Sequence, residues 1–443
     1  MPSSQRLPDL INPNERHLGL PPIDTLVPGI LAVLIAVPSP VSVSVSVGGI
    51  LSLILAPVTF AALWRNTRGR WLLIALLALV PSGWLVAQTT LQQDHGRTFS
   101  SKIFLYEAAM PVGLLASVIG AYWCITKLGL QRSLLCFFAG LLAAAPFTFS
   151  LINNNPWKYG LALPVSMLVV LLLARNRVLL GLVITPLLIA VSIASDFRGW
   201  IAFLAIATIL SVFSSSRRTR PSASRVASIG LATVATTTLV AWLISQAATA
   251  GILGGYLEQR TRDQLENSNG NLLLGGRPEW GAAIALWRQN PLGLGIGVVP
   301  SADDYWLAIR GMPLGAQARQ EISTVAESFQ QGQLGFHSTF WTFWGIYGVA
   351  GVVFVVLALV YAGQATIAAT AAIKWVALRA SVVLLLLSCI WDILFSATLV
   401  PQLAIAIATA LHILGRPNVE PIETKDPNCE RSSAHQRRHN HAQ

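Results

Sequence analysis

The 443-residue chain is 54% hydrophobic and only 11% charged, with a formal net charge of +11 at pH 7. This composition excludes an ordinary soluble globular protein and predicts an all-α, polytopic membrane protein. The first residues lack the charged start and short apolar core of a cleaved signal peptide. We therefore expect the amino terminus to be retained.

Apolar runs divide the chain into membrane and non-membrane parts. A membrane helix needs about 20 apolar residues, and this template predicts about 12 spans. The runs cover residues 25–40, 46–64, 71–88, 104–126, 133–152, 159–174, 178–194, 200–213, 226–247, 338–362, 376–395 and 397–414. The expected organisation is a cytoplasmic segment (1–24), spans 1–9 (25–247), one large outer loop (248–336), spans 10–12 (337–414) and a cytoplasmic tail (415–443).

The distribution of basic residues supports this threading, because Lys and Arg are retained on the cytoplasmic side of membrane proteins. With the amino terminus inside, most of the 30 basic residues fall in loops assigned to the inside, including 65–70 and 217–225. The positive net charge is thus a topology signal. It does not require a nucleic-acid partner, and both termini are expected to be cytoplasmic.

The large outer loop, about 90 residues long, is where we expect function, because compact membrane bundles otherwise use short connections. Two of its segments, 255–267 and 277–291, have helical spacing with apolar residues on one side. The glycine-rich stretch 292–300 follows the second. It lacks the preceding strand and the following Lys-Ser/Thr of a phosphate-binding loop, so we expect tight backbone packing there.

Two acidic residues, Glu107 and Asp392, fall within the predicted spans. An acid in a membrane helix is costly unless it is paired, so each is expected to have a partner. The four cysteines show neither metal-ligand nor CxxC spacing. We therefore expect neither a metal nor a redox cofactor.

Three sequence elements occur in order on the predicted outer face. His337 and Ser338 begin the run of span 10, and Gly348 and Gly351 follow after nine intervening residues. Upstream stand "GGRPEWGAAIALWRQNPLGLGIG" in the loop and "DFRGW" in the short turn between spans 7 and 8. Together they resemble the O-antigen ligase superfamily of bacterial polysaccharide enzymes, with its His-Ser/Asn and Gly-x-x-Gly signature.

The two upstream elements depart from the family patterns in detail. The family has a Gly-Arg-x-x-x-Trp helix followed by an Asn-Pro-Leu-x-Gly-x-Gly turn, and here Trp280 follows Arg277 one residue sooner. The family's Ser-Arg-Gly element has Phe197 in place of serine. The resemblance covers Asp196 to Gly351, and the spans on either side match only in number and hydropathy.

The resemblance implies a C-type glycosyltransferase-like enzyme of the bacterial inner membrane, surrounded by membrane lipids, with its active site facing the periplasm. Its donor would be a glycan on undecaprenyl diphosphate, and neither metal nor cofactor would be needed. The acceptor is lipid A-core in ligases, another repeat in O-antigen or exopolysaccharide polymerases, and a protein in O-oligosaccharyltransferases. A single large outer loop favours the ligase. A lipid-linked glycan transporter or flippase is the alternative of a different class, although transporters place binding residues near the midplane.

Residue roles carry over from the family by position. His337 is expected to accept the proton of the acceptor hydroxyl during an inverting displacement, and Arg277 and Arg198 to neutralise the diphosphate leaving group. Asp392 would orient His337 or an arginine. The expected substrate-binding or orienting residues are Arg288, Asp392, Ser338 and Trp280.

Each of these roles has a structural alternative. His337 could be a polar anchor at the head-group level. Arg277 could pair with Glu279 or with a lipid phosphate, and Arg198 could be a surface side chain that reaches to the interface. Trp280 could belong to an interfacial aromatic belt. Close helix packing is the expected role of the glycines after His337.

Overall fold

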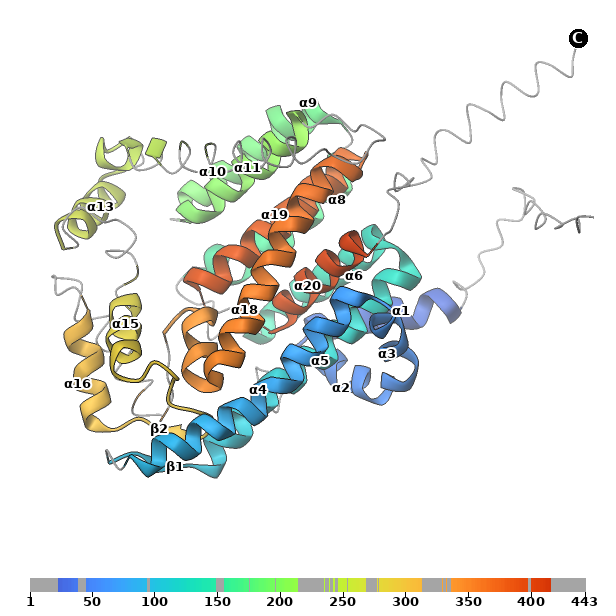
Figure 1. Cartoon of the computed structure of the whole chain (residues 1–443). Coiled ribbons are helices and arrows are strands. Elements are labelled where there is room, and N and C mark those ends of the chain that lie inside the picture. The colour runs from blue at the N-terminus through green and yellow to red at the C-terminus, as the bar shows by residue number, and fades with distance from the viewer. Residues whose placement is uncertain are drawn as a thin grey trace, which may run out of the picture.

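The computed structural model of the chain is almost entirely helical in the part that it describes (Figure 1). The described residues are 23–38, 45–93, 96–148, 155–174, 176–195, 197–213, 235, 239, 242–243, 246–252, 254–267, 277, 279–312, 329, 332, 336–396 and 400–415. For these residues the expectation of an all-α protein is confirmed.

Helices follow one another with short connections over most of the described chain. The α-helices are α1 (Ile23–Ala36), α2 (Val47–Ile54), α3 (Ala56–Trp64), α4 (Thr67–Gln92), α5 (Ser101–Leu128), α6 (Leu130–Ala144), α8 (Ala162–Leu173), α9 (Arg177–Leu179), α10 (Thr185–Ala194), α11 (Arg198–Phe213), α13 (Gly255–Asn267), α15 (Glu279–Gln289), α16 (Ala302–Gly311), α18 (Thr339–Ala372), α19 (Val376–Phe395) and α20 (Val400–Leu414). The other helical turns are η1 (Ala145–Thr148), η2 (Trp157–Leu161) and η3 (Leu180–Ile184). Two short strands, β1 (Thr98–Phe99) and β2 (Val298–Val299), pair antiparallel.

Several of these helices suit a membrane. Five in the described chain are long and apolar enough to cross one, and a sixth crossing results if α2 and α3, bent by 89° at their junction, form one span. The five are α4, α5, the stretch Arg177–Ala194, α18 and α19. Shorter apolar helices, α1, α6, α11 and α20 among them, lie between. This pattern is compatible with a multi-pass membrane protein.

The predicted spans overlap these helices along the chain, except for residues 226–247, which lie mostly outside the described residues. The predicted cytoplasmic ends also lie outside, before Ile23 and beyond Gly415. Of the predicted outer loop the structure describes mainly α13, α15 and α16. The number of crossings and the sidedness of the loop therefore stay predictions.

Polar caps determine where the long helices begin. The side-chain Oδ1 of Asn66 accepts the amide N–H groups of Arg68 and Gly69 at the start of α4. The hydroxyl of Ser100 accepts the Ile103 N–H at the start of α5. These bonds satisfy amides that lack a partner in the first helical turn. Apolar side chains then join α5 to α1 and α20, and α18 to α4, α19 and α20.

The α15–α16 pair lies beyond one end of α18 and α19, at the left of Figure 1. The two helices approach closely where Gly281 meets Gly311, because a Cβ on either glycine would collide with the backbone of the other. A second apolar cluster joins Leu286 of α15 and Ile309 of α16 to Trp344 of α18. The pair therefore rests on the first turns of α18, which bear the predicted site.

Candidate functional site

The start of α18 is bonded to the end of α19. Ser338 caps α18 by accepting the Trp341 N–H, and its hydroxyl donates to the Leu394 carbonyl at 2.7 Å. One residue on, the Thr339 N–H donates to the Ser396 carbonyl at 3.1 Å. Ser338 is fully buried, and its side chain both caps α18 and anchors it to α19. Its expected substrate-binding role stays a prediction.

His337 is held at this junction in an unusual backbone conformation. It is exposed, and its φ of 44° is the one positive value among the described non-glycine residues. Left-handed backbone is uncommon outside glycine, and strain of this kind tends to gather at functional sites. The bonds made by Ser338 and Thr339 hold His337 beside the carboxyl end of α19.

Trp280, in the first turn of α15, contacts the same end of α19. Its indole Nε1–H donates to the Leu394 carbonyl at 3.2 Å, the carbonyl that also accepts the Ser338 hydroxyl. Its ring stacks on Phe395 with centroids 5.0 Å apart and meets Trp341 edge-on at 5.9 Å. The Arg-x-x-Trp element and the His-Ser element thus meet on one carbonyl, although about 60 residues of chain separate them.

Asp392 lies two residues, about half a helical turn, before Leu394 and is half-buried. Burial disfavours the charged form of its carboxyl group, whereas the Arg277 guanidinium, just before α15, acts in the opposite direction and favours that charge. The arginine expected as a partner of Asp392 is therefore close enough to act on it, and the expected pairing of Asp392 with His337 stays a prediction. No ion pair joins Arg277 to Glu279 among the described residues, so one of the two structural alternatives for Arg277 is not seen there, and a contact with a lipid phosphate is not tested.

The two other arginines predicted for the site, Arg198 and Arg288, lie on different helices. Arg198 opens α11, and its side chain lies outside the described residues. Phe203, five residues later, contacts Trp391 with ring centroids 5.6 Å apart, which directs the start of α11 toward the same end of α19. Arg288 is exposed near the far end of α15, about 13 Å along the helix from its first residue. Arg288 therefore lies away from Asp392 and the carboxyl end of α19.

The glycine-rich turn after α15 is inserted against a break in α18. Gly348 has φ 61° and ψ −137° inside α18, which interrupts the helix. The freed Gly345 carbonyl accepts the amide N–H groups of Leu294 and Gly295 at 2.9 and 3.1 Å. The Ile296 N–H donates to Gly83 of α4 at 3.1 Å. The prediction of tight backbone packing in this turn is confirmed.

The glycines of α18 have a wider role than close helix packing. A Cβ on Gly348 would lie 2.9 Å from Val86 of α4, as helix packing predicts, but also 2.7 Å from the Leu292 carbonyl of the turn. A Cβ on Gly351 would collide with the carbonyl of Phe343 in α18 itself. The spacing therefore encodes a bend, which the sequence pattern alone did not predict.

Glu107, which the sequence marked as needing a partner, holds the same turn from α5. Its Oε2 accepts the Gly297 N–H at 2.7 Å, and its backbone carbonyl accepts the Tyr347 hydroxyl at 2.6 Å. The turn therefore contacts α4, α5 and α18 at once. No role for Glu107 beyond pairing followed from sequence, because Gly297 is about 190 residues away.

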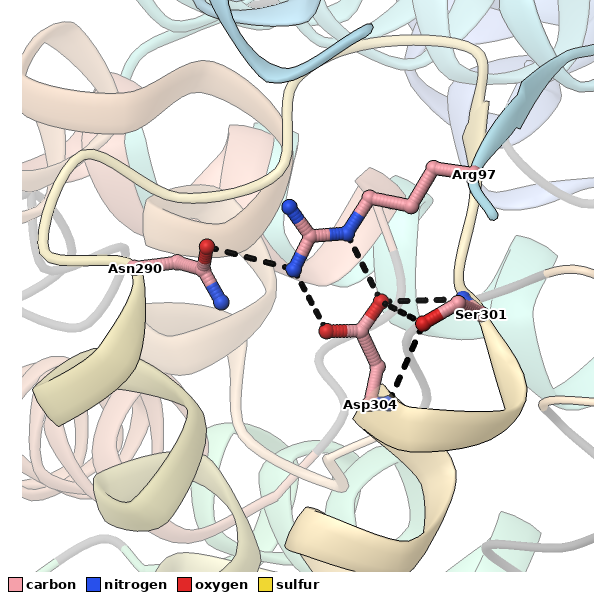
Figure 2. Close-up of polar contacts among 4 residues, drawn as sticks. All are labelled: Arg97, Asn290, Ser301 and Asp304. Carbon is pink, nitrogen blue, oxygen red and sulfur yellow. Dashed lines mark hydrogen bonds and ion pairs between the residues drawn. The ribbon is translucent and has the colours of Figure 1, made fainter. Parts of the chain in front are cut away.

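A buried ion pair that sequence reasoning missed ties the α4–α5 connection to α16 (Figure 2). Arg97 donates through Nε and Nη2 to the two carboxylate oxygens of Asp304, at 2.8 and 2.6 Å, and through Nη2 to Asn290 at 3.2 Å. Asp304 also accepts the Ser301 N–H in a capping box that starts α16. A lone arginine in a short predicted loop gives no signal of such a partner.

Electrostatics favour the charged form of Asp304. Burial alone would raise the pKa of its carboxyl group, but hydrogen bonds and charge from Arg97, together with the Ser301 bonds, bring the pKa below the ordinary 3.8. The two side chains are only 1% and 2% exposed. The Arg97–Asp304 pair positions α15 and α16, because Arg97 also donates to Asn290 just after α15. It lies at the opposite end of α15 from Arg277.

No protein-family model matches the chain, and neither a curated protein nor a solved structure does. Within the described residues, no three His, Cys, Asp or Glu side chains gather as a metal site would require. The fold defines a helical protein of membrane-like composition. Its candidate site gathers a histidine, an arginine, a carboxylate and aromatic rings at the junction of α15, α18 and α19.

Proposed function

We propose that the protein is a membrane glycan transferase of the O-antigen ligase type. It would move O-antigen polysaccharide from undecaprenyl diphosphate to lipid A-core at the periplasmic face of the bacterial inner membrane. The observation that carries this proposal is the meeting of Trp280 and Ser338 on the Leu394 carbonyl, next to Asp392. It brings two of the family-like elements, remote in sequence, into one cluster.

The proposed topology has about 12 crossings, both termini in the cytoplasm and residues 248–336 outside. It is supported by the basic residues of the intervening loops and by the apolar helices of the described chain. In this topology the carboxyl end of α19 and the start of α18 face the periplasm. A glycan carried by a membrane lipid would be within reach there.

The proposed reaction is a single displacement at the anomeric carbon of the donor sugar. The acceptor hydroxyl attacks that carbon, the bond between carbon and diphosphate oxygen breaks, and undecaprenyl diphosphate leaves with the bonding electrons. The His337 imidazole takes the proton of the attacking hydroxyl. The anomeric configuration is inverted, because the attack and the departure occur on opposite faces.

Charge that develops on the leaving diphosphate needs fixed cations nearby. Arg277 supplies one, since a guanidinium group matches phosphate oxygens in a bidentate way. Asp392 would orient Arg277 at the end of α19, since the two groups interact electrostatically there. Arg198 is the second proposed cation, because the start of α11 points to the same end of α19. The proposed reaction uses no metal.

A lipid-linked glycan transporter is the alternative from another class. Transporters bind their cargo near the midplane, at broken helices with unsatisfied carbonyls. α18 is broken, but the Gly345 and Tyr347 carbonyls at the break accept bonds from the turn and from Ser82. Because these carbonyls already accept hydrogen bonds, fewer acceptors remain there for a transported ligand. This favours chemistry at the end of α19 over transport.

The test uses the purified full chain in lipid nanodiscs with a glycan on undecaprenyl diphosphate and a lipid A-core acceptor. We expect joining of the two without added metal, and a loss of roughly a hundredfold or more with His337→Ala. His439→Ala, in the tail beyond the described residues, is the matched control and should retain activity. Unimpaired joining by a folded His337→Ala protein would refute His337 as the base.

Ligase and polymerase are separated by the lipopolysaccharide of a host lacking the protein. Free polymer that accumulates on its lipid carrier identifies a ligase, whereas core that carries a single repeat identifies a polymerase. Transfer to a protein acceptor in the purified system would instead indicate an O-oligosaccharyltransferase. The ligase is favoured because one outer loop, 248–336, contains most of the predicted outer residues.

A further inference from the structure

Two buried polar atoms at the α15–α18 contact have no hydrogen-bond partner among the described residues. They are the carboxyl Oε2 of Glu279, in the first residue of α15, and the indole Nε1 of Trp341, in the first turn of α18. Glu279 is 4% exposed and Trp341 is 9% exposed. Buried polar atoms are nearly always paired in native proteins, so each unpaired one calls for a physical explanation.

Both atoms belong to the candidate site and have opposite hydrogen-bonding character. Glu279 directly precedes Trp280, whose ring meets Trp341 edge-on at 5.9 Å and stacks on Phe395. A carboxylate oxygen accepts hydrogen bonds, whereas an indole N–H only donates. One acceptor and one donor beside aromatic rings match a group that both donates and accepts. A hydroxyl-bearing sugar ring, with apolar C–H faces that pack on aromatic rings, is such a group.

The charges at the site argue against a phosphate at this position. A carboxyl group repels a phosphate when both are ionised, and Glu279 forms no ion pair with Arg277 in the described chain. Arg277 instead acts electrostatically on Asp392. Arg277 therefore suits an anionic group, whereas the unpaired atoms of Glu279 and Trp341 suit a neutral, hydroxyl-bearing group.

We propose that Glu279 and Trp341 are substrate-binding residues that recognise hydroxyl groups of a sugar ring. Oε2 of Glu279 accepts a hydrogen bond from one hydroxyl, and Nε1–H of Trp341 donates to a hydroxyl oxygen. The sugar as ligand class rests on the proposed function, but the two residues are assigned from their burial and unpaired atoms. They determine which sugar is accepted beside the reacting bond, whereas His337 and Arg277 act on that bond.

The test measures sugar binding separately from transfer. Saturation-transfer NMR on the full chain in nanodiscs would use methyl hexopyranosides, their single-deoxy analogues and lipid-free core oligosaccharide as probes. Trp341→Phe removes only the N–H, and Glu279→Leu removes the carboxyl. We expect each to weaken binding of its sugar probe roughly tenfold, the equivalent of one lost hydrogen bond.

Matched controls carry the same chemical changes elsewhere. Trp306→Phe changes a tryptophan of α16 that is 57% exposed, and Glu266→Leu changes an exposed acid of α13. Both should bind the probes as the parent protein does. The deoxy analogue that lacks the recognised hydroxyl should bind weakly to the parent protein. It should lose little further affinity with Trp341→Phe, because the two changes remove the same bond.

Two results would overturn the inference. One is that Trp341→Phe binds every probe as tightly as the parent protein does. If Glu279→Leu does not fold, the result with Trp341→Phe alone decides the test. The other is that every deoxy analogue loses the same affinity, in the parent protein and in the variants alike. Sugar binding that depends on Trp341 without transfer from a lipid diphosphate donor would support this inference and refute the proposed function. Normal transfer with variants that bind unchanged would refute the inference alone.

Discussion

Removal of the Asp304 carboxylate should destabilise the α15–α16 pair markedly. Asp304→Ala deletes both bonds from Arg97, at 2.8 and 2.6 Å, and the acceptor for the Ser301 N–H at 2.9 Å. Arg97 would remain buried without its counter-charge. Breaking one partner of a buried ion pair costs about 3–5 kcal/mol, and loss of a helix cap costs about 1 kcal/mol. The local free energy of opening should fall by about 3–5 kcal/mol, since the terms overlap.

Amide hydrogen exchange followed by mass spectrometry measures this local opening directly, in residues 302–311 and 96–100 of the full chain. The double variant Arg97→Met with Asp304→Leu is the control, because it replaces both charges by apolar groups. It should exchange much closer to the parent protein than Asp304→Ala does. A change below about 1 kcal/mol in Asp304→Ala would refute the reasoning, since it would show that the pair is not held as described.

The same pair gives a defined pH dependence. The pKa of Asp304 is lowered in the folded protein from its ordinary 3.8. A depressed carboxyl pKa contributes stability that is fully present above the unfolded pKa and is lost as the pH falls through the folded one. Protection of α16 should therefore be constant from pH 7 to about 5 and fall only below about pH 4. Asp304→Ala should lack this acid-dependent loss.

Two further predictions concern the turn beside α18. Gly348→Ala, at φ 61° and 2.7 Å from the Leu292 carbonyl, should cost at least about 1–2 kcal/mol in thermal unfolding. Gly363→Ala, with no atom within 4 Å of its Cβ, should be neutral or stabilising, and equal behaviour of the two would contradict the bend. Glu107→Leu should leave the Gly297 N–H unpaired. The free energy of opening, measured by hydrogen exchange in residues 292–297, should fall by about 1–3 kcal/mol. Glu107→Gln keeps an oxygen acceptor and should lower this free energy by less. Equal losses in the two variants would exclude the bond to Gly297 as the cause.

The helical architecture was predictable because apolar runs of membrane length have one favourable structure when water is absent. Most predicted runs overlap helices within a few residues. The bend in α18 was not predictable, because Gly348 and Gly351 fit either close packing or a break. The choice depends on the turn at 292–297, which contacts α18 only in the folded chain.

The candidate site was predicted in part. Arg277, Trp280, Ser338 and Asp392 meet at the end of α19, as the ordered motifs indicated, whereas Arg288 lies apart. From sequence, Glu279 was considered only as a partner for Arg277. An acid at the start of a helix ordinarily interacts favourably with the helix dipole, so nothing indicated a binding role. The burial of Glu279 and its unpaired oxygen are visible only in three dimensions.

The filled break in α18 has a consequence for motion. A glycine inside a long helix is a natural hinge, but rotation about Gly348 would disrupt several bonds together, those made by the Gly345 carbonyl and by Tyr347. The turn that fills this hinge also follows the end of α15, so we expect the outer part of α18 and α15 to move together. His337 and Arg277 lie at the starts of these two segments, so the filled hinge would restrict changes in their relative position, as the proposed reaction requires.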